Sequence, residues 1–220
     1  EWIMGERAAA LVGEVKLGDT RLDRRLEQIV EQTLEQPHAT IPEASGSWAA
    51  TTGTYRFLEN DGVSPAAMID GVGRSTVARG PSEGVLLAVQ DTTSIDYRAH
   101  RATRGLGPLE SAHCRGVVLH STLAVTPEGT PVGLLDQQIW ERDPATLGKS
   151  EQRAEVPIEG KESAKWLLAM RAVMERVAGR CQVVTVADRE ADVYEVFALA
   201  TELESEWVIR ARHDRQLADG

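Results

Sequence analysis

The sequence predicts an α/β protein in which a small helical domain precedes a mixed β-sheet. Two observations lead to this prediction. Over the first eighty residues, apolar side chains recur at the spacing of helices. After Pro81, short apolar runs bounded by turn signals take over, and two longer amphipathic segments interrupt them. We therefore expect two domains, residues 1–78 and residues 79–220.

Start and stop signals in the first domain predict three helices, at residues 20–36, 48–60 and 64–78. The first begins after Gly18-Asp19-Thr20 and stops at Pro37. Its apolar stripe consists of Leu22, Leu26, Ile29, Val30 and Leu34. Ser64 is placed to cap the third helix. The residues between the first two helices, which include Pro42, predict a loop.

The second domain predicts five strands and two helices. We expect strands at residues 85–89, 117–125, 131–140, 183–187 and 206–212, and helices at 161–178 and 191–204. A polar loop of about twenty residues follows the first strand, and Pro127-Glu128-Gly129-Thr130 makes a hairpin turn. The first three strands are then antiparallel, whereas helical crossovers favour parallel pairing of the last two. This order is that of ribonuclease H-like folds.

The composition is that of an ordinary globular protein, with 42% apolar residues among 220. No apolar run reaches the roughly 18 residues that a membrane span needs. The N-terminus lacks the basic start and apolar stretch of a signal peptide. Two cysteines, Cys114 and Cys181, do not make a disulfide framework. We therefore expect a reduced, cytoplasmic setting and no membrane partner.

The charge balance argues against nucleic-acid binding at first sight. The net charge is −10, and the first sixty residues hold six basic side chains against ten carboxylates. A DNA-binding protein is more often basic. Binding nevertheless depends on where the charges lie, so an acidic total leaves room for a local basic stripe.

Two of the predicted strands lead directly into aspartates, Asp91 and Asp188. In open α/β sheets, functional groups gather at the carboxyl ends of strands. If the first and fourth strands are parallel neighbours, both carboxylates lie at one edge and can share Mg²⁺ or Mn²⁺. With a third carboxylate, such a site can cut phosphodiesters. An aspartate after a strand also serves as a helix cap or turn residue, and this alternative stays open.

Other candidate sites are weaker. The histidine-cysteine pair at residues 113–114 has no zinc spacing with His120, which falls inside a predicted strand and is better interpreted as a packed histidine. Ser121 lacks a nucleophile elbow. Glu190 and Asp192 have the positions of an exposed helix start, where carboxylates complement the helix dipole.

Four short segments stand out in order along the chain. They are Gly18-Asp19-Thr20-Arg21-Leu22 with Arg25-Leu26, Gly53-Thr54-Tyr55-Arg56-Phe57-Leu58, Asp91-Thr92-Thr93-Ser94, and Asp188-Arg189-Glu190-Ala191-Asp192. Between the last two lie Val132-Gly133-Leu134-Leu135 and Lys161-Glu162-Ser163-Ala164-Lys165-Trp166. Together these segments resemble bacterial DDE transposases of the transposon-five type, within the insertion-sequence-four group.

The resemblance implies a function for each domain. Residues 1–78 would recognise double-stranded DNA at a transposon end, and residues 79–220 would form a ribonuclease H-like catalytic domain. Asp91 and Asp188 match the first two members of the catalytic triad, which uses Mg²⁺ or Mn²⁺. The arginines implied to contact DNA are Arg21, Arg25, Arg56, Arg189 and Arg210. The family cuts DNA at transposon ends and joins them to a target as a synaptic homodimer.

The sequence departs from the family pattern at its end. The third carboxylate of the family lies on a later helix, and the sequence reaches Gly220 before any such helix. We therefore expect a chain truncated before this glutamate, with little or no cleavage of its own. Two alternatives stay open: a catalytically inactive DNA-binding or inhibitory fragment, and an α/β domain without a nucleic-acid role, which the acidic charge favours.

Overall fold

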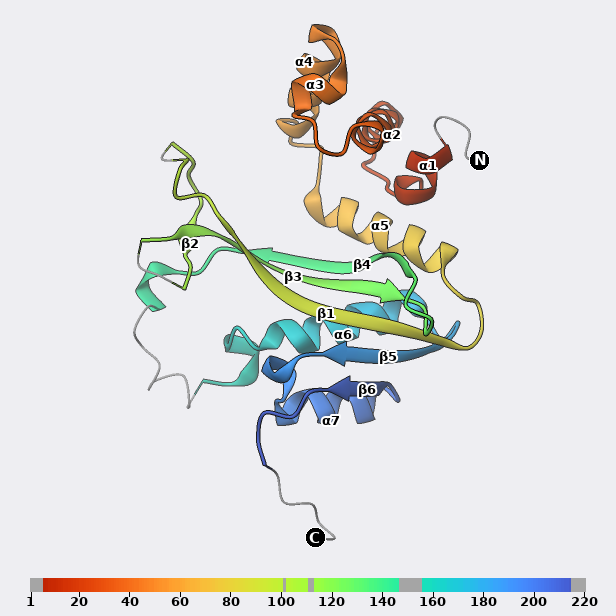
Figure 1. The fold of residues 1–220 in the computed structure, drawn as a ribbon, viewed down its shortest axis with the longest axis vertical. Coiled ribbons are helices and arrows are strands. Elements are labelled where there is room, and N and C mark those ends of the chain that lie inside the picture. Colours follow the sequence, from red (N-terminus) through yellow and green to blue (C-terminus); the bar gives the residue numbers. More distant parts are fainter. Residues whose placement is uncertain (1–5, 101, 111–112, 147–155, 215–220) are drawn as a thin grey trace. The chain divides into compact units, whose positions relative to one another are not determined.

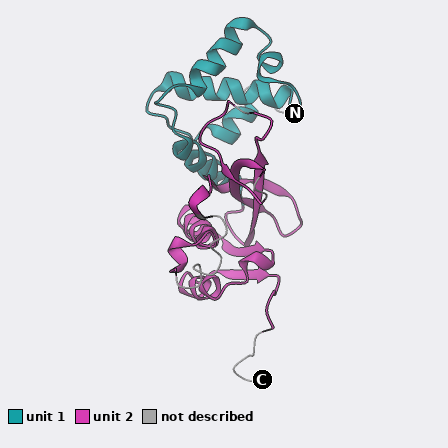
Figure 2. Cartoon of the chain, turned by 90° about the vertical axis from the view of Figure 1, so that its left-hand side faces the viewer, with its two compact units in different colours: residues 1–80 teal, residues 81–220 magenta. Residues whose placement is uncertain are grey.

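The computed structural model describes residues 6–100, 102–110, 113–146 and 156–214. The chain forms two compact units, Glu1–Gly80 and Pro81–Gly220, which Figure 2 shows in teal and magenta. The predicted α/β class is confirmed, because helices build the first unit and a mixed sheet with helices builds the second (Figure 1). None of the described helices is long and apolar enough to cross a membrane.

Five helices make up the described part of the N-terminal unit. They are α1 (Glu6–Val12), α2 (Thr20–Glu35), α3 (Ile41–Ser45), α4 (Trp48–Leu58) and α5 (Pro65–Arg79). The side chains of Asp19, Ser47 and Ser64 accept hydrogen bonds from backbone N–H groups at the starts of α2, α4 and α5. The three predicted helices are confirmed, and their caps explain why they begin where they do.

The loop predicted between the first two of those helices was wrong in part, because it contains the short helix α3. Thr40 and Glu43 form a capping box, in which the Thr40 backbone N–H donates to Glu43 Oε2 at 2.8 Å. Pro42 lies in the first turn, where a missing N–H is tolerated. Gly46 then ends the helix in the left-handed conformation, at φ 66°. Pro42 here lies in the first turn of a helix, whereas the prediction placed it in a loop.

An apolar core fixes the positions of α2 and α4 within this unit. Val12, Val15, Leu26 and Phe57 form its buried centre. Helix α5 approaches the segment that follows α1 so closely that a Cβ on Gly71 would lie 2.4 Å from the Val15 Cα. Only glycine permits this contact, because no real Cβ approaches a backbone atom so closely.

The second unit is built on a six-stranded sheet. Its described strands are β1 (Val85–Asp96), β2 (Gly107–Pro108), β3 (Arg115–Val125), β4 (Pro131–Trp140), β5 (Gln182–Ala187) and β6 (Glu206–Ile209). Strand β3 pairs antiparallel with β1, β2 and β4, whereas β5 pairs parallel with β1 and β6. The long strands therefore run in the order β4-β3-β1-β5-β6, with the predicted antiparallel and parallel pairings (Figure 1).

One face of the sheet is covered by the helices α6 (Ala164–Val177) and α7 (Tyr194–Glu202). In the first half of β1 every second residue is buried there, namely Leu86, Ala88 and Gln90. Trp166 and Met170 of α6 belong to the apolar core on this side. We call it the helix-covered face.

The residues that alternate with them make up the opposite face, which we call the Asp91 face. In β1 it carries Leu87 and Val89, which are half-buried, and Asp91, which is exposed. In β5 the half-buried Val184 and Val186 occupy the matching positions. The two faces therefore differ in burial along the same strands.

Strand β1 is longer than predicted. It stays paired with β3 as far as Asp96, whereas its pairing with β5 stops at Val89 and Val186. The β-branched Thr92 and Thr93 favour extended backbone, and the long β3 offers a partner. Asp91 therefore lies within β1, level with the end of β5. The prediction that this aspartate terminates its own strand was wrong.

Strand β5 ends at Ala187 as predicted, and Asp188 follows as the cap of a single 3-10 turn, η4 (Arg189–Ala191). The Asp188 Oδ1 accepts a hydrogen bond from the Glu190 backbone N–H at 2.8 Å. The alternative interpretation of Asp188 as a capping residue is thus confirmed, and it leaves the second carboxylate oxygen available.

Asp192 was predicted to be solvent-exposed, and this was wrong. Its side chain is 3% exposed and accepts hydrogen bonds from the backbone N–H groups of Arg212 and His213, at 2.6 and 2.9 Å. The carboxylate satisfies two backbone donors after β6, so it anchors that segment to the start of α7. Sequence distance hid this contact, which spans about twenty residues.

Candidate functional site

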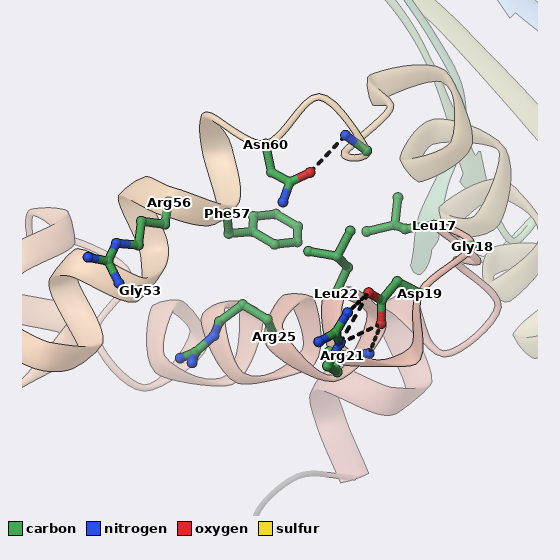
Figure 3. A pocket seen from close by; sticks show the side chains of 11 residues that line it. Leu17, Gly18, Asp19, Arg21, Leu22, Arg25, Gly53, Arg56, Phe57 and Asn60 are labelled. Atoms are coloured by element: carbon green, nitrogen blue, oxygen red, sulfur yellow. Dashed lines mark hydrogen bonds and ion pairs between the residues drawn. The ribbon is translucent and has the colours of Figure 1, made fainter.

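A cleft of about 700 Å³ lies between α2 and α4 in the N-terminal unit (Figure 3). Its lining includes Arg21 and Arg25 from α2 and Arg56 from α4. The structure thus brings three of the five arginines predicted to bind DNA into one place. We call it the arginine cleft.

Arg25 lies flat against α4. A Cβ at Gly53 would be 3.2 Å from both Cζ and Nη1 of Arg25, so the guanidinium occupies the space that a side chain would take. Within the described residues, the side chains of Arg25 and Arg56 make neither a hydrogen bond nor an ion pair. Their donors are therefore free for a ligand.

Arg21 differs from the other two because it is already paired. Its Nη2 lies 2.7 Å from Asp19 Oδ2. The hydrogen bonds from Arg21, first from its side chain and then from its backbone, lower the pKa of Asp19 to about 2. The Asp19 carboxylate offsets the charge of Arg21, so the uncompensated positive charge of the cleft comes from Arg25 and Arg56.

Several carboxylates of this unit serve the fold and lie outside the cleft. Asp23 Oδ1 accepts a hydrogen bond from the Leu17 backbone N–H at 2.8 Å, and Glu31 Oε2 accepts one from the Ala8 backbone N–H at 3.1 Å. Glu43 closes the capping box of α3. None of these three carboxylates lines the cleft. The acidic composition of the N-terminal residues therefore does not describe the charge at this surface.

Asp91 and Asp188 lie at the same end of the parallel pairing between β1 and β5. The parallel register pairs Val89 with Val186, and each aspartate follows two residues later. This pair is the last between the two strands, so both aspartates lie just beyond the point where β1 and β5 stop pairing. Both residues are exposed. The register therefore brings together the two residues that the sequence proposed as a metal site.

Arg210 extends this row across the sheet. Its backbone N–H donates to the Ala187 carbonyl at 3.2 Å, which continues the ladder between β5 and β6 and makes Arg210 the neighbour of Asp188. Arg210 and Arg189 are both exposed, and Arg189 belongs to η4. Within the described residues, neither arginine forms an ion pair with the two aspartates.

The donors of this row suit a hard divalent cation. Mg²⁺ prefers oxygen ligands and is commonly held by one or two carboxylates together with water and substrate phosphates. Asp91 and Asp188 meet that description. In the part of the chain that the structure describes, no group of three or more His, Cys, Asp or Glu side chains gathers at a metal-binding distance. The row thus offers two carboxylates, without a third.

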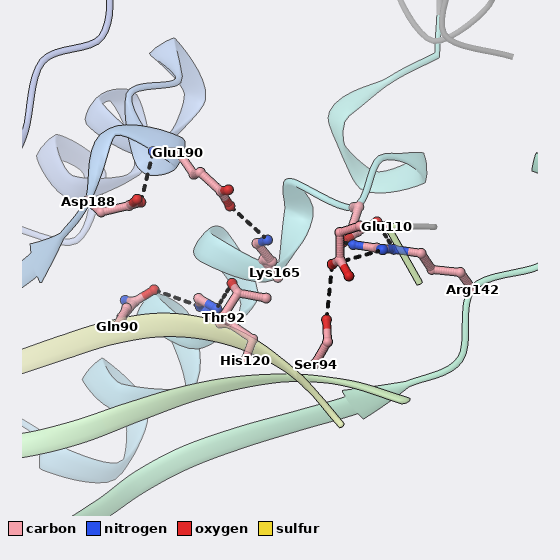
Figure 4. Close-up of polar contacts among 10 residues, drawn as sticks. Gln90, Thr92, Ser94, Glu110, His120, Arg142, Lys165, Asp188 and Glu190 are labelled. Atoms are coloured by element: carbon pink, nitrogen blue, oxygen red, sulfur yellow. Dashed lines mark hydrogen bonds and ion pairs between the residues drawn. The ribbon is translucent and has the colours of Figure 1, made fainter. Parts of the chain in front are cut away.

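A second cleft, of about 720 Å³, lies at the helix-covered face beside β1. Figure 4 shows that Lys165 and Arg142, two of its charged side chains, are paired with carboxylates. Lys165 Nζ lies 3.5 Å from Glu190 Oε2, and Arg142 Nη2 lies 2.7 Å from Glu162 Oε1. No pattern in the sequence predicted this cleft, because its lining residues come from distant segments. Neither catalytic-candidate aspartate lines it.

His120 lies beneath this second cleft, and the prediction of a packed histidine is confirmed. It is 1% exposed, with Nδ1 2.9 Å from Thr92 Oγ1 and Nε2 3.1 Å from Gln90 Oε1. Its ring meets Trp166 edge to face at 4.5 Å. Burial, together with the nearby charge of Lys165, lowers the pKa of His120 to about 4. The imidazole is therefore neutral at pH 7 and belongs to the core.

Sequence reasoning left Ser121 and Gln137 without a role, yet the structure joins them. Gln137 Nε2 donates a hydrogen bond to Ser121 Oγ at 2.9 Å, from β4 to β3. A signal was present in the sequence: Ser121 is a polar residue at a position that alternates with the apolar Leu119 and Leu123 on the same strand.

Residues 4–63 match the family model described as transposase DNA-binding. The matched range contains α2 and α4, and therefore the whole arginine cleft. The match supports a transposase N-terminal region in this part of the chain, with a transposase-related DNA-binding role and DNA as its partner.

Proposed function

We propose that this chain is the end-binding and metal-binding part of a cut-and-paste DDE transposase of the transposon-five type, in the insertion-sequence-four group. The observation that carries the proposal is the match of residues 4–63 to transposase DNA-binding regions, because it coincides with a cleft that presents Arg25 and Arg56 without protein partners. The strand order β4-β3-β1-β5-β6 favours a ribonuclease H-like fold for the second unit.

The arginine cleft would hold the phosphate backbone of a transposon end. A guanidinium presents a planar set of donors that matches a phosphate, and it stays charged at every physiological pH. Arg25 is held in place against Gly53 and Arg56 is exposed, so one is fixed and the other free to follow the DNA. Each phosphate contact displaces counterions, which makes the affinity depend on salt.

The test is a salt titration of DNA binding. The affinity of the chain for a duplex carrying a candidate transposon end is measured between low and physiological salt, for the native chain and for Arg56→Ala. Losing one phosphate contact should reduce the slope of log affinity against log salt by about 1. The control is Arg7→Ala, which removes an exposed arginine from α1, outside the cleft. Binding that does not respond to salt contradicts the proposal.

In the second unit, Asp91 and Asp188 would hold Mg²⁺ or Mn²⁺ through carboxylate oxygens. A cation there supplies an activated water and charge stabilisation for phosphodiester cleavage. Arg189 and Arg210, both exposed beside the aspartates, would contact the DNA that enters this site. The support for this assignment is the parallel pairing of β1 with β5, because Asp91 and Asp188 each follow two residues after the last paired residues, Val89 and Val186.

This metal site is tested by titrating Mn²⁺ into the native chain and into Asp91→Asn and Asp188→Asn. Each substitution keeps the side-chain shape and removes one charged ligand, so the affinity for Mn²⁺ should fall at least tenfold if a ligand contributes about 1.4 kcal/mol or more. Asp96→Asn is the matched control, since Asp96 lies on the same strand and pairs with Arg98. Equal binding by all four proteins rejects the site.

A second candidate function is DNA binding without cleavage. It is favoured by the two-carboxylate row, because no third metal ligand joins it within the described residues. Incubation of the chain with end-containing DNA and Mn²⁺ separates the candidates. Nicking that disappears in Asp91→Asn supports the enzyme, whereas tight binding without nicking supports a binding or inhibitory role.

We also propose that two copies pair two DNA ends when the protein is complete. Symmetric pairing is the commonest form of protein assembly, and a synapse needs one copy for each end. Sedimentation of the chain with and without duplex DNA tests whether the described units suffice. A complex of two chains and two duplexes is the supporting result, and one chain on one duplex is the opposing one.

A further inference from the structure

Three polar residues on the Asp91 face form one row across the sheet. Asp91 is the register partner of Ser121, and Ser121 is the register partner of Gln137. The row therefore crosses β1, β3 and β4, and on the other side of β1 Asp188 follows two residues after the last residue of β5 that pairs with β1. The hydrogen bond from Gln137 Nε2 to Ser121 Oγ, at 2.9 Å, links its outer two members.

The neighbouring rows on β3 and β4 are apolar. Leu119 pairs with Ile139 on one side of the row, and Leu123 pairs with Leu134 on the other. A serine-glutamine pair in this position adds nothing to apolar packing, and its bond alone is a weak source of stability. This pair lies next to Asp91 in the register, between the two apolar rows of β3 and β4. Its location therefore points to a role at the metal site.

We propose that Ser121, oriented by Gln137, is a positioning residue that donates a hydrogen bond to the Asp91 carboxylate and sets its direction toward the cation. The inference rests on the proposed metal site. Residues directly opposite on antiparallel strands have Cβ atoms roughly 5 Å apart. A rotation of the Ser121 and Asp91 side chains about their χ1 bonds would bring the two groups within hydrogen-bond distance. Because the Ser121 oxygen accepts from Gln137, its own proton is free to be donated to the nearest anion of the row, Asp91.

Such outer partners matter because they fix the orientation of a metal ligand before the cation arrives. Removing one typically lowers metal affinity by about 10–100-fold. Gln137 contacts Ser121 and would not contact Asp91 itself, so removing its side chain should lower the metal affinity by less than removing the Ser121 hydroxyl. Neither residue would be a metal ligand in this arrangement, so a change in affinity would report the orientation of Asp91.

The test is a Mn²⁺ titration followed by electron paramagnetic resonance, which counts free Mn²⁺ directly. Ser121→Ala should weaken binding by about 10–100-fold, and Gln137→Ala by less. Ser121→Thr retains the hydroxyl and should restore binding to near the native level. Gln182→Ala is the control, because Gln182 is an exposed glutamine at the other end of β5 and lies outside the row. Thermal unfolding of each variant verifies that it is folded.

The outcomes separate this inference from the function on which it rests. If Asp91→Asn weakens Mn²⁺ binding and Ser121→Ala does not, the metal site stands and the positioning role is overturned. If Asp91→Asn has no effect, both are overturned. If Ser121→Thr binds as poorly as Ser121→Ala, the hydroxyl is not the active group, which also rejects the proposal.

Discussion

The two clefts of this protein differ in whether their basic side chains are paired with carboxylates. In the arginine cleft, Arg25 and Arg56 have no protein partner within the described residues. In the cleft of the second unit, Lys165 and Arg142 are paired with carboxylates. Paired charges hold the fold together, whereas unpaired ones remain available to a ligand. A chain with a net charge of −10 can therefore still present a positive surface to DNA.

The largest effect is expected where a paired charge is most deeply buried. Arg176 Nη1 lies 2.7 Å from Asp136 Oδ1, with side-chain exposures of 14% and 9%, and also donates to the Leu135 carbonyl. Asp136→Asn removes the carboxylate charge that contacts this guanidinium and should lower the free energy of unfolding by about 3 kcal/mol. Urea unfolding measures this loss. A change below about 1 kcal/mol would place this pair among the exposed, weak ones.

Acid should weaken the second unit more than the first. The pKa of His120 is lowered from 6.5 to about 4 in the folded chain. The unfolded chain then binds a proton at a higher pH than the native one, so stability is complete above about pH 6.5 and falls as the pH drops toward 4. The loss attributable to His120 should approach about 3 kcal/mol near pH 4.

Thermal unfolding between pH 4 and 7 tests this, with His120→Gln as the comparison. The variant should show a flatter dependence on pH, because its side chain does not titrate. Identical pH profiles for the native chain and the variant would refute the assignment.

Gly53→Ala should change stability and DNA binding in opposite directions. Alanine favours the middle of a helix over glycine by up to about 1 kcal/mol, so α4 should gain stability. The new Cβ would lie 3.2 Å from the Arg25 guanidinium and displace it. We expect a DNA affinity reduced by a few fold, which corresponds to less than about 1 kcal/mol. Calorimetric melting and a binding titration on the same sample measure both. Unchanged affinity would mean that the placement of Arg25 is irrelevant to DNA.

The smallest effect is expected for Glu190→Gln. Glu190 is the partner of Lys165, but its side chain is 59% exposed and the separation is 3.5 Å. Solvent screens such a pair, so the loss of stability should stay within about 0.5 kcal/mol. Chemical denaturation of Glu190→Gln and Asp136→Asn under the same conditions compares their losses of unfolding free energy directly. A loss as large as that of Asp136→Asn would show that the second cleft depends on its surface charges as much as on its buried ones.

The fold was largely predictable because its signals are local. Ser64 marks the start of α5, and the turn after Pro127 separates β3 from β4 at the expected residues. The failures were contacts with distant partners. Asp192 looked like an exposed helix start until its bonds to Arg212 and His213 were known. The length of β1 likewise depends on the strand beside it, β3, which the sequence of β1 does not contain.

The site was predictable to a lesser degree. The position of Asp91 and Asp188 after apolar runs suggested that they meet, because parallel neighbours align their ends. The pairing of Ser121 with Gln137 requires the register between β3 and β4, which shifts after Thr122 at an irregularity in the ladder. No pattern within a single strand specifies that offset. Likewise, the contact between the Arg25 guanidinium and Gly53 depends on how α2 packs against α4.

The unequal lengths of β1 and β5 have a consequence for amide exchange. As far as Val89, β1 is an interior strand with a partner on both sides. Beyond it, β3 alone pairs with β1 among the described strands, so alternate backbone N–H groups lose a strand partner. Protection against deuterium should therefore be uniform up to Val89 and alternate from Asp91 to Asp96. The strand changes from interior to edge at the residue that carries the carboxylate, which leaves that carboxylate beside an open flank.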